Sequence, residues 1–185
     1  MAKGSGGTRA RMPASYKYAP NFASHDSTIE VHKRIASNAV ARLRRIINDK
    51  ERDGFTRDAT QFKFGTLSNT LAKKYQEVTG IKIINRDMYT GASSLFHHRG
   101  GKKAENGKET SYEDIANMPM NIGTMDVYVH SGAIVFTDDK NKFVLQPNQK
   151  VKINREKTIV TNHLSSSRVK DKNAFDVEHG YMKIK

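Results

Sequence analysis

Two clusters of polar residues in this chain carry the side-chain types that could cleave RNA without a metal ion. The first is His97-His98-Arg99, followed by Lys102 and Lys103, and the second is Thr161-Asn162-His163, followed by Ser165, Ser166 and Arg168. Such cleavage needs a base for the 2′-hydroxyl proton, an acid for the leaving oxygen and a cation near the developing phosphorane charge. Histidine suits the first two roles near neutral pH, and lysine or arginine suits the third.

The first cluster runs into a glycine-rich basic loop. Gly100-Gly101 and Asn106-Gly107 alternate with the basic residues, and glycine lets the backbone come close to a phosphate group. We therefore predict that nucleic acid is bound by four basic residues: Lys102, Lys103, Lys108 and Arg168. Three other histidines are interpreted as packing or surface residues: His32 in the first predicted helix, His130 at the end of a predicted strand and His179 near the C-terminus.

Several other kinds of chemistry are disfavoured by missing motifs. The GxxxxGK[ST] spacing of a nucleotide-hydrolysing loop is absent, as are an HExxH motif and a GxSxG motif, and the chain contains no cysteine. The adjacent acidic pairs Glu113-Asp114 and Asp138-Asp139 suit a helix start and a turn better than a cation site. The sequence thus predicts neither a metal nor a cofactor.

The charge of the chain indicates a polyanionic partner. Among 185 residues, 32 are Lys or Arg and 19 are Asp or Glu, which gives a net charge of +13. Nucleic acid is the first partner to expect, with RNA favoured over DNA, although ribosomal surfaces and acidic membranes attract such proteins too. No apolar run approaches the roughly 20 residues of a membrane-spanning helix, and the N-terminus lacks the apolar core of a signal peptide, so we expect a soluble protein without a membrane partner.

A run of predicted strands must position the second cluster. Alternating apolar and polar residues, rich in β-branched and aromatic types, are separated by short turns between Met125 and Leu164. This pattern predicts an antiparallel meander of about five strands. The predicted strands cover residues 126–130, 133–137, 142–146, 151–154 and 158–164.

The rest of the chain is predicted to add helices and a few short strands. Residues 1–26 are predicted to be a disordered basic arm and residues 27–185 a single α+β domain, with a core at 60–165 and a C-terminal extension at 166–185. Helices are expected at 27–53 up to Gly54, from Ser68 to Gly80, and from a Thr110–Glu113 capping box to Met118, stopped by Pro119. In the second helix we expect Leu71, Ala72, Tyr75 and Val78 to face inward. Further strands are expected at 62–65, 81–85 and 180–184.

The order of these elements resembles the phage-associated branch of the barnase, EndoU, colicin and RelE-like nuclease superfamily. The likeness covers roughly residues 60–165 and rests on the short helix ending in Met118-Pro119, then MDVYVHSGAIVFTDDKNKFVLQPN and KTIVTNHL. The opening MAKGSGGTR also resembles the starts of proteins carried by bacteriophages or prophages of gut bacteria. The resemblance implies an α+β fold with helices packed on one face of the antiparallel meander, and RNA cleavage by a histidine on the sheet. The catalytic positions that it implies are His97, His98, Arg99, Thr161 and His163.

The sequence leaves three functions open. The first is a metal-independent ribonuclease, the second a non-catalytic basic module that binds nucleic acid or belongs to a virion, and the third a small inhibitor of host defence that acts by protein contact. For all three, the expected location is the cytoplasm of a bacterial host or a virion. A ribonuclease needs two of His97, His98 and His163 to converge, whereas a binding module does not.

Overall fold

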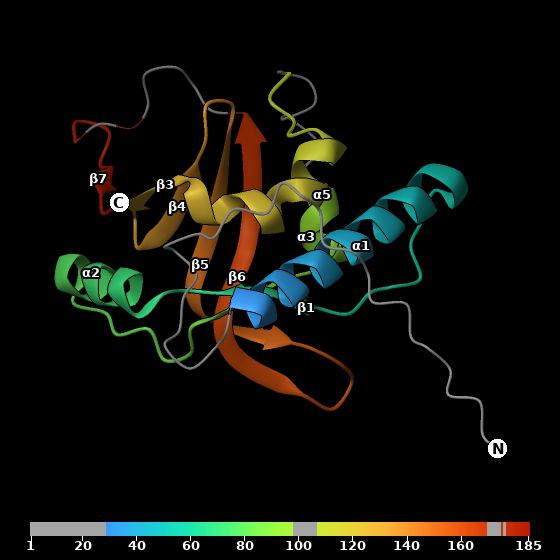
Figure 1. Cartoon of the computed structure of the whole chain (residues 1–185), viewed down its shortest axis with the longest axis horizontal. Helices are drawn as coiled ribbons and strands as arrows, with labels where there is room; N and C mark the ends of the chain where they lie inside the picture. Colours follow the sequence, from blue (N-terminus) through green and yellow to red (C-terminus); the bar gives the residue numbers. More distant parts are fainter. Residues whose placement is uncertain (1–28, 98–106, 170–174, 176) are drawn as a thin grey trace.

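The computed structural model describes residues 29–97, 107–169, 175 and 177–185, and these form an α+β fold with an open, mostly antiparallel sheet (Figure 1). The predicted basic arm, residues 1–26, lies outside the described residues. The helices are α1 (Ile29–Asp53), α2 (Asn69–Thr79), α3 (Ala92–His97), α5 (Tyr112–Asn121) and the 3₁₀ helix η1 (Ile122–Thr124). The strands are β1 (Phe62–Thr66), β2 (Asp87–Thr90), β3 (Asp126–His130), β4 (Ala133–Thr137), β5 (Asn141–Lys152), β6 (Thr158–Val169) and β7 (Met182–Lys183).

The ends of α1 and α2 follow the predicted signals. Gly54, with φ of 76°, donates its N–H to the carbonyl of Lys50 and ends α1. Ser68 caps α2 by accepting a hydrogen bond from Leu71 N at 3.1 Å, and Gly80 ends the helix in the left-handed conformation. The prediction that Val78 faces inward is wrong, because this side chain is 37% exposed.

Helix α5 is longer than predicted. Its N-cap is Ser111 rather than Thr110, and the Ser111 hydroxyl accepts from Asp114 N at 3.0 Å. Pro119 lies inside the helix instead of stopping it. A proline so close to the C-terminal end removes only one helical hydrogen bond, and η1 continues the chain directly.

The seven strands lie in the order β1-β2-β6-β5-β4-β3-β7, and their only parallel pairing is that of β2 with β6. Strands β3 to β6 form the predicted antiparallel meander, but with four strands rather than five. Pro147 and Asn148 do not separate two strands as predicted. They form an irregularity inside β5, where Asn148 takes a φ of 55° and the register with β6 shifts.

Two other strand predictions need correction. Strand β6 continues to Val169 instead of ending at Leu164, because its far half pairs with the start of β5. Residues 81–85 are not a strand. Ile81 and Ile84 are 48% and 72% exposed, and the segment leads into β2, which begins at Asp87.

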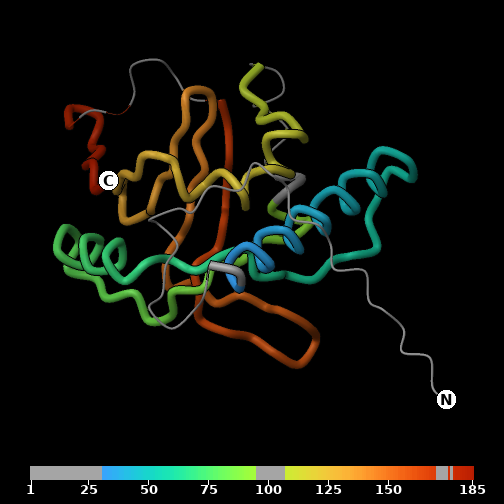
Figure 2. Tube along the Cα trace, in the orientation of Figure 1, coloured from blue at the N-terminus to red at the C-terminus, as the bar shows by residue number. Residues whose placement is uncertain are grey.

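One hydrophobic core joins the helices to one face of the sheet. Helices α1 and α5 contact each other and cross the same face in Figure 1, and the trace in Figure 2 shows the same arrangement. The core includes Leu43 of α1, Tyr75 of α2, Met88 of β2 and Leu164 of β6. Since side chains alternate along a strand, Tyr89 and His163 lie on the opposite face from Met88 and Leu164.

Candidate active site at the end of β2

The parallel pair of β2 and β6 places His163 where β2 leaves the sheet. Met88 pairs with Asn162 and Tyr89 pairs with His163, which is the last register position of this pair. Strand β2 ends at Thr90, and α3 begins two residues later at Ala92. Helix α3 then lies in contact with β6. The candidate site is therefore built by the junction between β2 and α3 on one side and by β6 on the other.

Strand β2 connects to α3 through a single residue, Gly91, which lies against the end of the Gln61 side chain. A Cβ atom at Gly91 would lie 2.7 Å from the side-chain nitrogen of Gln61, so a larger residue here would require this flexible side chain to move. This short connection brings Ser94 back toward β6.

Ser94 and His163 form a hydrogen-bonded pair. The Ser94 hydroxyl lies 2.9 Å from Nε2 of the His163 ring, although 69 residues separate them in the chain. Ser94 is buried, and His163 is half-buried. Among the described residues this is the ring's only hydrogen bond, and Nδ1 has no partner there.

The surroundings of His163 favour its neutral form. Burial lowers the pKa of His163 below the ordinary histidine value of 6.5. The Ser94 hydroxyl can accept from Nε2–H or donate to Nε2, and in the tautomer in which it accepts, the lone pair of the neutral ring lies on Nδ1. His163 can thus accept a proton at neutral pH with its ring held in one orientation.

Thr161 and Asn162 fasten β6 to the backbone of β2 and the residues before it. The Thr161 hydroxyl donates to the Asp87 carbonyl at 2.6 Å. The Asn162 amide donates to the carbonyls of Asn85 and Asp87 at 2.6 and 2.9 Å. Both side chains are fully buried. Thr161, predicted as a catalytic residue, therefore helps to fix the strand that carries His163.

The predicted basic residues Lys108 and Arg168 come together at the far end of β6. Val169 N, next to Arg168, donates to the Lys108 carbonyl at 3.0 Å. Arg168 lies five residues beyond His163, which corresponds to about 16 Å along a strand. The structure thus brings Lys108 to Arg168 but does not bring either residue to His163.

The other predicted residues of the first cluster cannot be placed around His163. His97 is the last residue of α3, three positions after Ser94, and only its backbone is described. His98, Arg99, Lys102 and Lys103 lie outside the described residues. The convergence of a second histidine on His163 stays a prediction.

The three histidines interpreted as packing or surface residues have different surroundings. His32 is 5% exposed on α1, and its Nε2 has no hydrogen-bond partner in the described ranges of the chain. Burial, followed by the charges of Lys63 and Arg86, lowers the pKa of His32. His130 stacks on Tyr181 with ring centroids 4.1 Å apart, and His179 is exposed.

The described part of the chain contains no group of three His, Cys, Asp or Glu side chains arranged to hold a metal ion. None of its helices combines the length and the apolar character needed to cross a membrane.

No known protein family, no curated protein and no solved structure matches this chain. The resemblance to the barnase, EndoU, colicin and RelE-like superfamily stays a prediction.

Sequence reasoning missed Ser94 as a site residue. Its immediate neighbours, Gly91-Ala92-Ser93, are small residues that follow a strand, which is a feature of many turns. Nothing local in the sequence connects this serine to a histidine 69 residues away. Only the parallel pairing of β2 with β6 makes the connection.

Proposed function

We propose that the protein is a metal-independent ribonuclease in which His163 is the general base. The hydrogen bond between Ser94 and His163 is the observation that carries this proposal. It joins a histidine that burial keeps neutral to a hydroxyl group that fixes the orientation of its ring. A base with a pKa near or below neutrality and a fixed position is what proton abstraction from a sugar hydroxyl requires.

In the proposed step, Nδ1 of His163 takes the proton of a ribose 2′-hydroxyl. The 2′-oxygen then forms a bond to the adjacent phosphorus, and the bond from phosphorus to the 5′-oxygen of the next nucleotide breaks. An acid returns a proton to this leaving oxygen, so the products are a 2′,3′-cyclic phosphate and a free 5′-hydroxyl. Ser94 acts through His163 as a positioning residue.

The acid and the cation come from the first cluster in this proposal. His97 or His98 would protonate the leaving oxygen, and Arg99 or a neighbouring lysine would stabilise the charge on the phosphorane. Their residue types support these roles, as does the position of His97 at the end of the helix that carries Ser94. The bacteriophage setting likewise rests on the sequence resemblance.

Cleavage of a short RNA in the presence of EDTA tests the proposal. We expect wild-type protein to cut RNA and to leave 2′,3′-cyclic phosphate ends, while the 2′-O-methyl version of the same oligonucleotide stays whole. His163→Ala should lower the cleavage rate by about 10² or more. The matched control His179→Ala changes an exposed histidine and should cut as wild type does. Intact RNA with EDTA and with magnesium alike, or a fully active His163→Ala protein, would overturn the proposal.

A non-catalytic module that binds nucleic acid is the second candidate function. The observation that favours it is the net charge of +13, which needs no catalytic group to attract a polyanion. This alternative predicts that RNA is bound but never cut, with an affinity that falls steeply as salt rises because counterions are released. An affinity that does not change between low and physiological salt would exclude it.

A further inference from the structure

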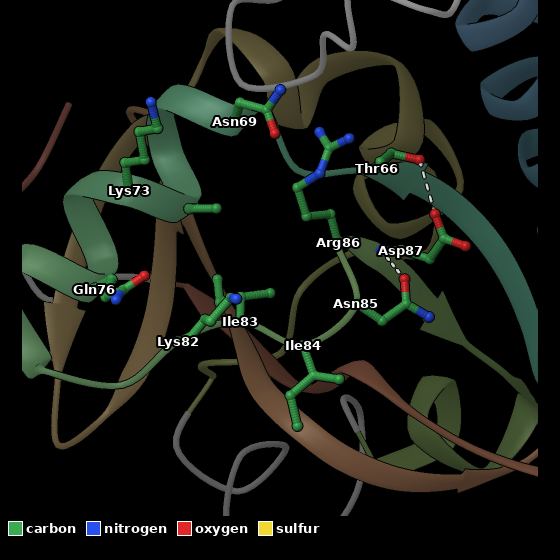
Figure 3. Close-up of a pocket in the computed structure, with 11 residues that line it drawn as sticks. Thr66, Asn69, Lys73, Gln76, Lys82, Ile83, Ile84, Asn85, Arg86 and Asp87 are labelled. Carbon is green, nitrogen blue, oxygen red and sulfur yellow. Dashed lines mark hydrogen bonds between the residues drawn. The ribbon is translucent and has the colours of Figure 1, made fainter.

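A cavity of about 490 Å³ lies between one face of α2 and the segment that leads into β2 (Figure 3). Helix α2 contributes Asn69, Lys73 and Gln76, which are spaced so that they share one side of the helix. The segment 82–87 contributes the opposite wall. The volume falls within the range of pockets that enclose small-molecule ligands.

The lining of this cavity carries an excess of positive charge. Its cations are Lys73, Lys82 and Arg86, and its only carboxylate is Asp87. Asp87 already pairs with Lys63, since Nζ of this lysine lies 2.7 Å from a carboxylate oxygen. Among the described residues, none of the three cations forms an ion pair. The walls of this cavity therefore carry a positive charge that attracts an anionic group.

Arg86 is held in position inside the cavity. Its Nη1 donates to the Leu67 carbonyl at 2.8 Å, and its own carbonyl accepts from Leu67 N at the same distance. Figure 3 shows its guanidinium group between Asn69 and Thr66. Its other N–H groups form no hydrogen bond within the described part of the chain, and an arginine fork fits the oxygens of a phosphate group well.

The sheet braces the wall formed by segment 82–87. Asn148 of β5 donates to the Lys82 carbonyl and accepts from Ile84 N, both at 2.9 Å. Asn162 of β6 holds the carbonyls of Asn85 and Asp87. A wall that is fixed before a ligand arrives lowers the entropic cost of binding.

We propose that this cavity binds a nucleotide through its phosphate group. The cations would contact the phosphate, and the amides of Asn69 and Gln76 offer the paired donors and acceptors that recognise the edge of a base. Ile84 also lines the cavity and is 72% exposed, so it offers apolar surface to a sugar or base. The cavity is much larger than a phosphate ion, which favours a whole nucleotide.

This nucleotide can be a free molecule or one unit of an RNA chain, since both present the same chemistry. The inference goes beyond the proposed ribonuclease activity, because binding in this cavity requires neither His163 nor Ser94. Binding is therefore measured in the full-length His163→Ala protein, where a failure of cleavage has no effect on the result.

Isothermal titration calorimetry tests the proposal. Three kinds of probe are used: inorganic phosphate, each of the four ribonucleoside 5′-monophosphates in turn, and a short single-stranded RNA. At least one monophosphate should bind more tightly than inorganic phosphate. Replacing Lys73 and Lys82 together by Gln should weaken that binding tenfold or more. A matched control in which Lys74 and Lys150 are replaced by Gln should change it less than twofold, because both lysines are exposed and neither lines the cavity.

The outcomes separate the two sources of the ligand. Tighter binding of the RNA than of any monophosphate, lost in the Lys73→Gln, Lys82→Gln protein, would identify a unit of an RNA chain. Equal binding of the RNA and the best monophosphate would identify the free nucleotide or a chain end. The proposal is overturned if no monophosphate and no RNA depends on Lys73 and Lys82, or if inorganic phosphate binds as tightly as every nucleotide.

Discussion

The two ends of β2 carry polar groups that are used in opposite ways. Before and at the start of the strand, Thr161 and Asn162 donate to backbone carbonyls, and their hydrogen bonds fix the path of the chain. At its end, His163 and Ser94 bond to each other. A side chain that donates to a backbone carbonyl stabilises the fold, whereas the role that we propose for His163 requires it to exchange a proton with a substrate. Under this proposal, neighbouring residues on β6 divide structural and chemical tasks.

The largest effect that this comparison predicts is on stability. Asn162→Ala should remove two hydrogen bonds made by a fully buried side chain: the Asn85 carbonyl loses its side-chain donor, and the Asp87 carbonyl keeps only that from Thr161, which together costs about 2–4 kcal/mol of unfolding free energy. For a protein of this size, the melting temperature should fall by roughly 5–15 °C. Thermal unfolding followed by circular dichroism measures this change.

The control for Asn162→Ala is Asn38→Ala, which removes an exposed asparagine from α1. It should leave the melting temperature unchanged or slightly raised, because alanine favours a helix. If Asn162→Ala were as harmless as Asn38→Ala, the bonds to the carbonyls would not be what holds this region.

The second prediction concerns the hydrogen bond between Ser94 and His163. Ser94→Ala should lower kcat for RNA cleavage about tenfold with little change in KM, because the ring of His163 loses its partner but the substrate contacts remain. Stability should change by less than about 1.5 kcal/mol, since one hydrogen bond is lost. Steady-state kinetics and thermal unfolding of the same preparation measure both quantities.

Ser93→Ala is the matched control for Ser94→Ala. Ser93 is the exposed neighbour of Ser94 on α3, and its hydroxyl accepts one long hydrogen bond, of 3.5 Å, from the Gln61 amide. This variant should keep the activity of the wild type. A Ser94→Ala protein with unchanged kcat would show that the pair has no part in positioning His163.

The sequence predicted the local features of the fold well. Ser68, Gly54 and Gly80 mark helix ends through contacts within a few residues, so their effect can be recognised in a short window. The alternation between Met125 and Leu164 likewise predicted an antiparallel meander, although with about five strands in place of the four, β3 to β6, that form it, because each of these strands pairs with its neighbour in sequence. The α+β class followed from these elements.

Features that depend on distant contacts could not be predicted. The apolar run at 81–85 looks like a strand. Its backbone, however, bonds to the side chains of Asn148 and Asn162 and not to the backbone of a neighbouring strand. The junction that brings Ser94 to His163 requires the parallel pairing of β2 with β6, which joins residues more than 70 positions apart. One clue was present at Asn162, because asparagine is depleted in strand interiors and its burial there demands partners.

The third prediction uses pH to compare the surroundings of two buried histidines. The pKa of His163 is lowered by burial, and that of His32 by burial and by the charges of Lys63 and Arg86. Both folded-state pKa values lie below the unfolded value of about 6.5. The unfolded chain therefore binds more protons below that pH, and the unfolding free energy should decline as pH falls from 7 toward 5.

Urea unfolding across this pH range checks the decline. His32→Leu and His163→Gln should each reduce its slope, whereas His179→Gln, which changes an exposed residue, should not. NMR titration of the ring protons sharpens the comparison, because added salt should raise the pKa of His32 by screening its cations and should leave the pKa of His163 nearly unchanged. If salt changed both pKa values equally, nearby cations would not be what distinguishes the pKa shift of His32 from that of His163.

The smallest effect on stability is expected at Asn148, a half-buried residue of β5 whose side chain bonds to segment 82–87. Its backbone has a φ of 55°, a conformation that glycine adopts without strain. Asn148→Gly therefore removes only the hydrogen bonds to Lys82 and Ile84, and partly exposed hydrogen bonds of this kind contribute little. The unfolding free energy should change by less than about 1 kcal/mol.

The same variant should nevertheless weaken nucleotide binding in the cavity about threefold, because Lys82 would lose the support that holds its backbone against α2. Ser131→Gly is the matched control, since Ser131 has a similar φ of 48° in the turn between β3 and β4 and does not line the cavity. Calorimetric titration with the best ribonucleoside monophosphate compares the two variants. If both variants bind as tightly as wild type, nucleotide binding does not require the hydrogen bonds from Asn148 to segment 82–87. The preorganisation of this wall by Asn148 would then contribute nothing to the affinity.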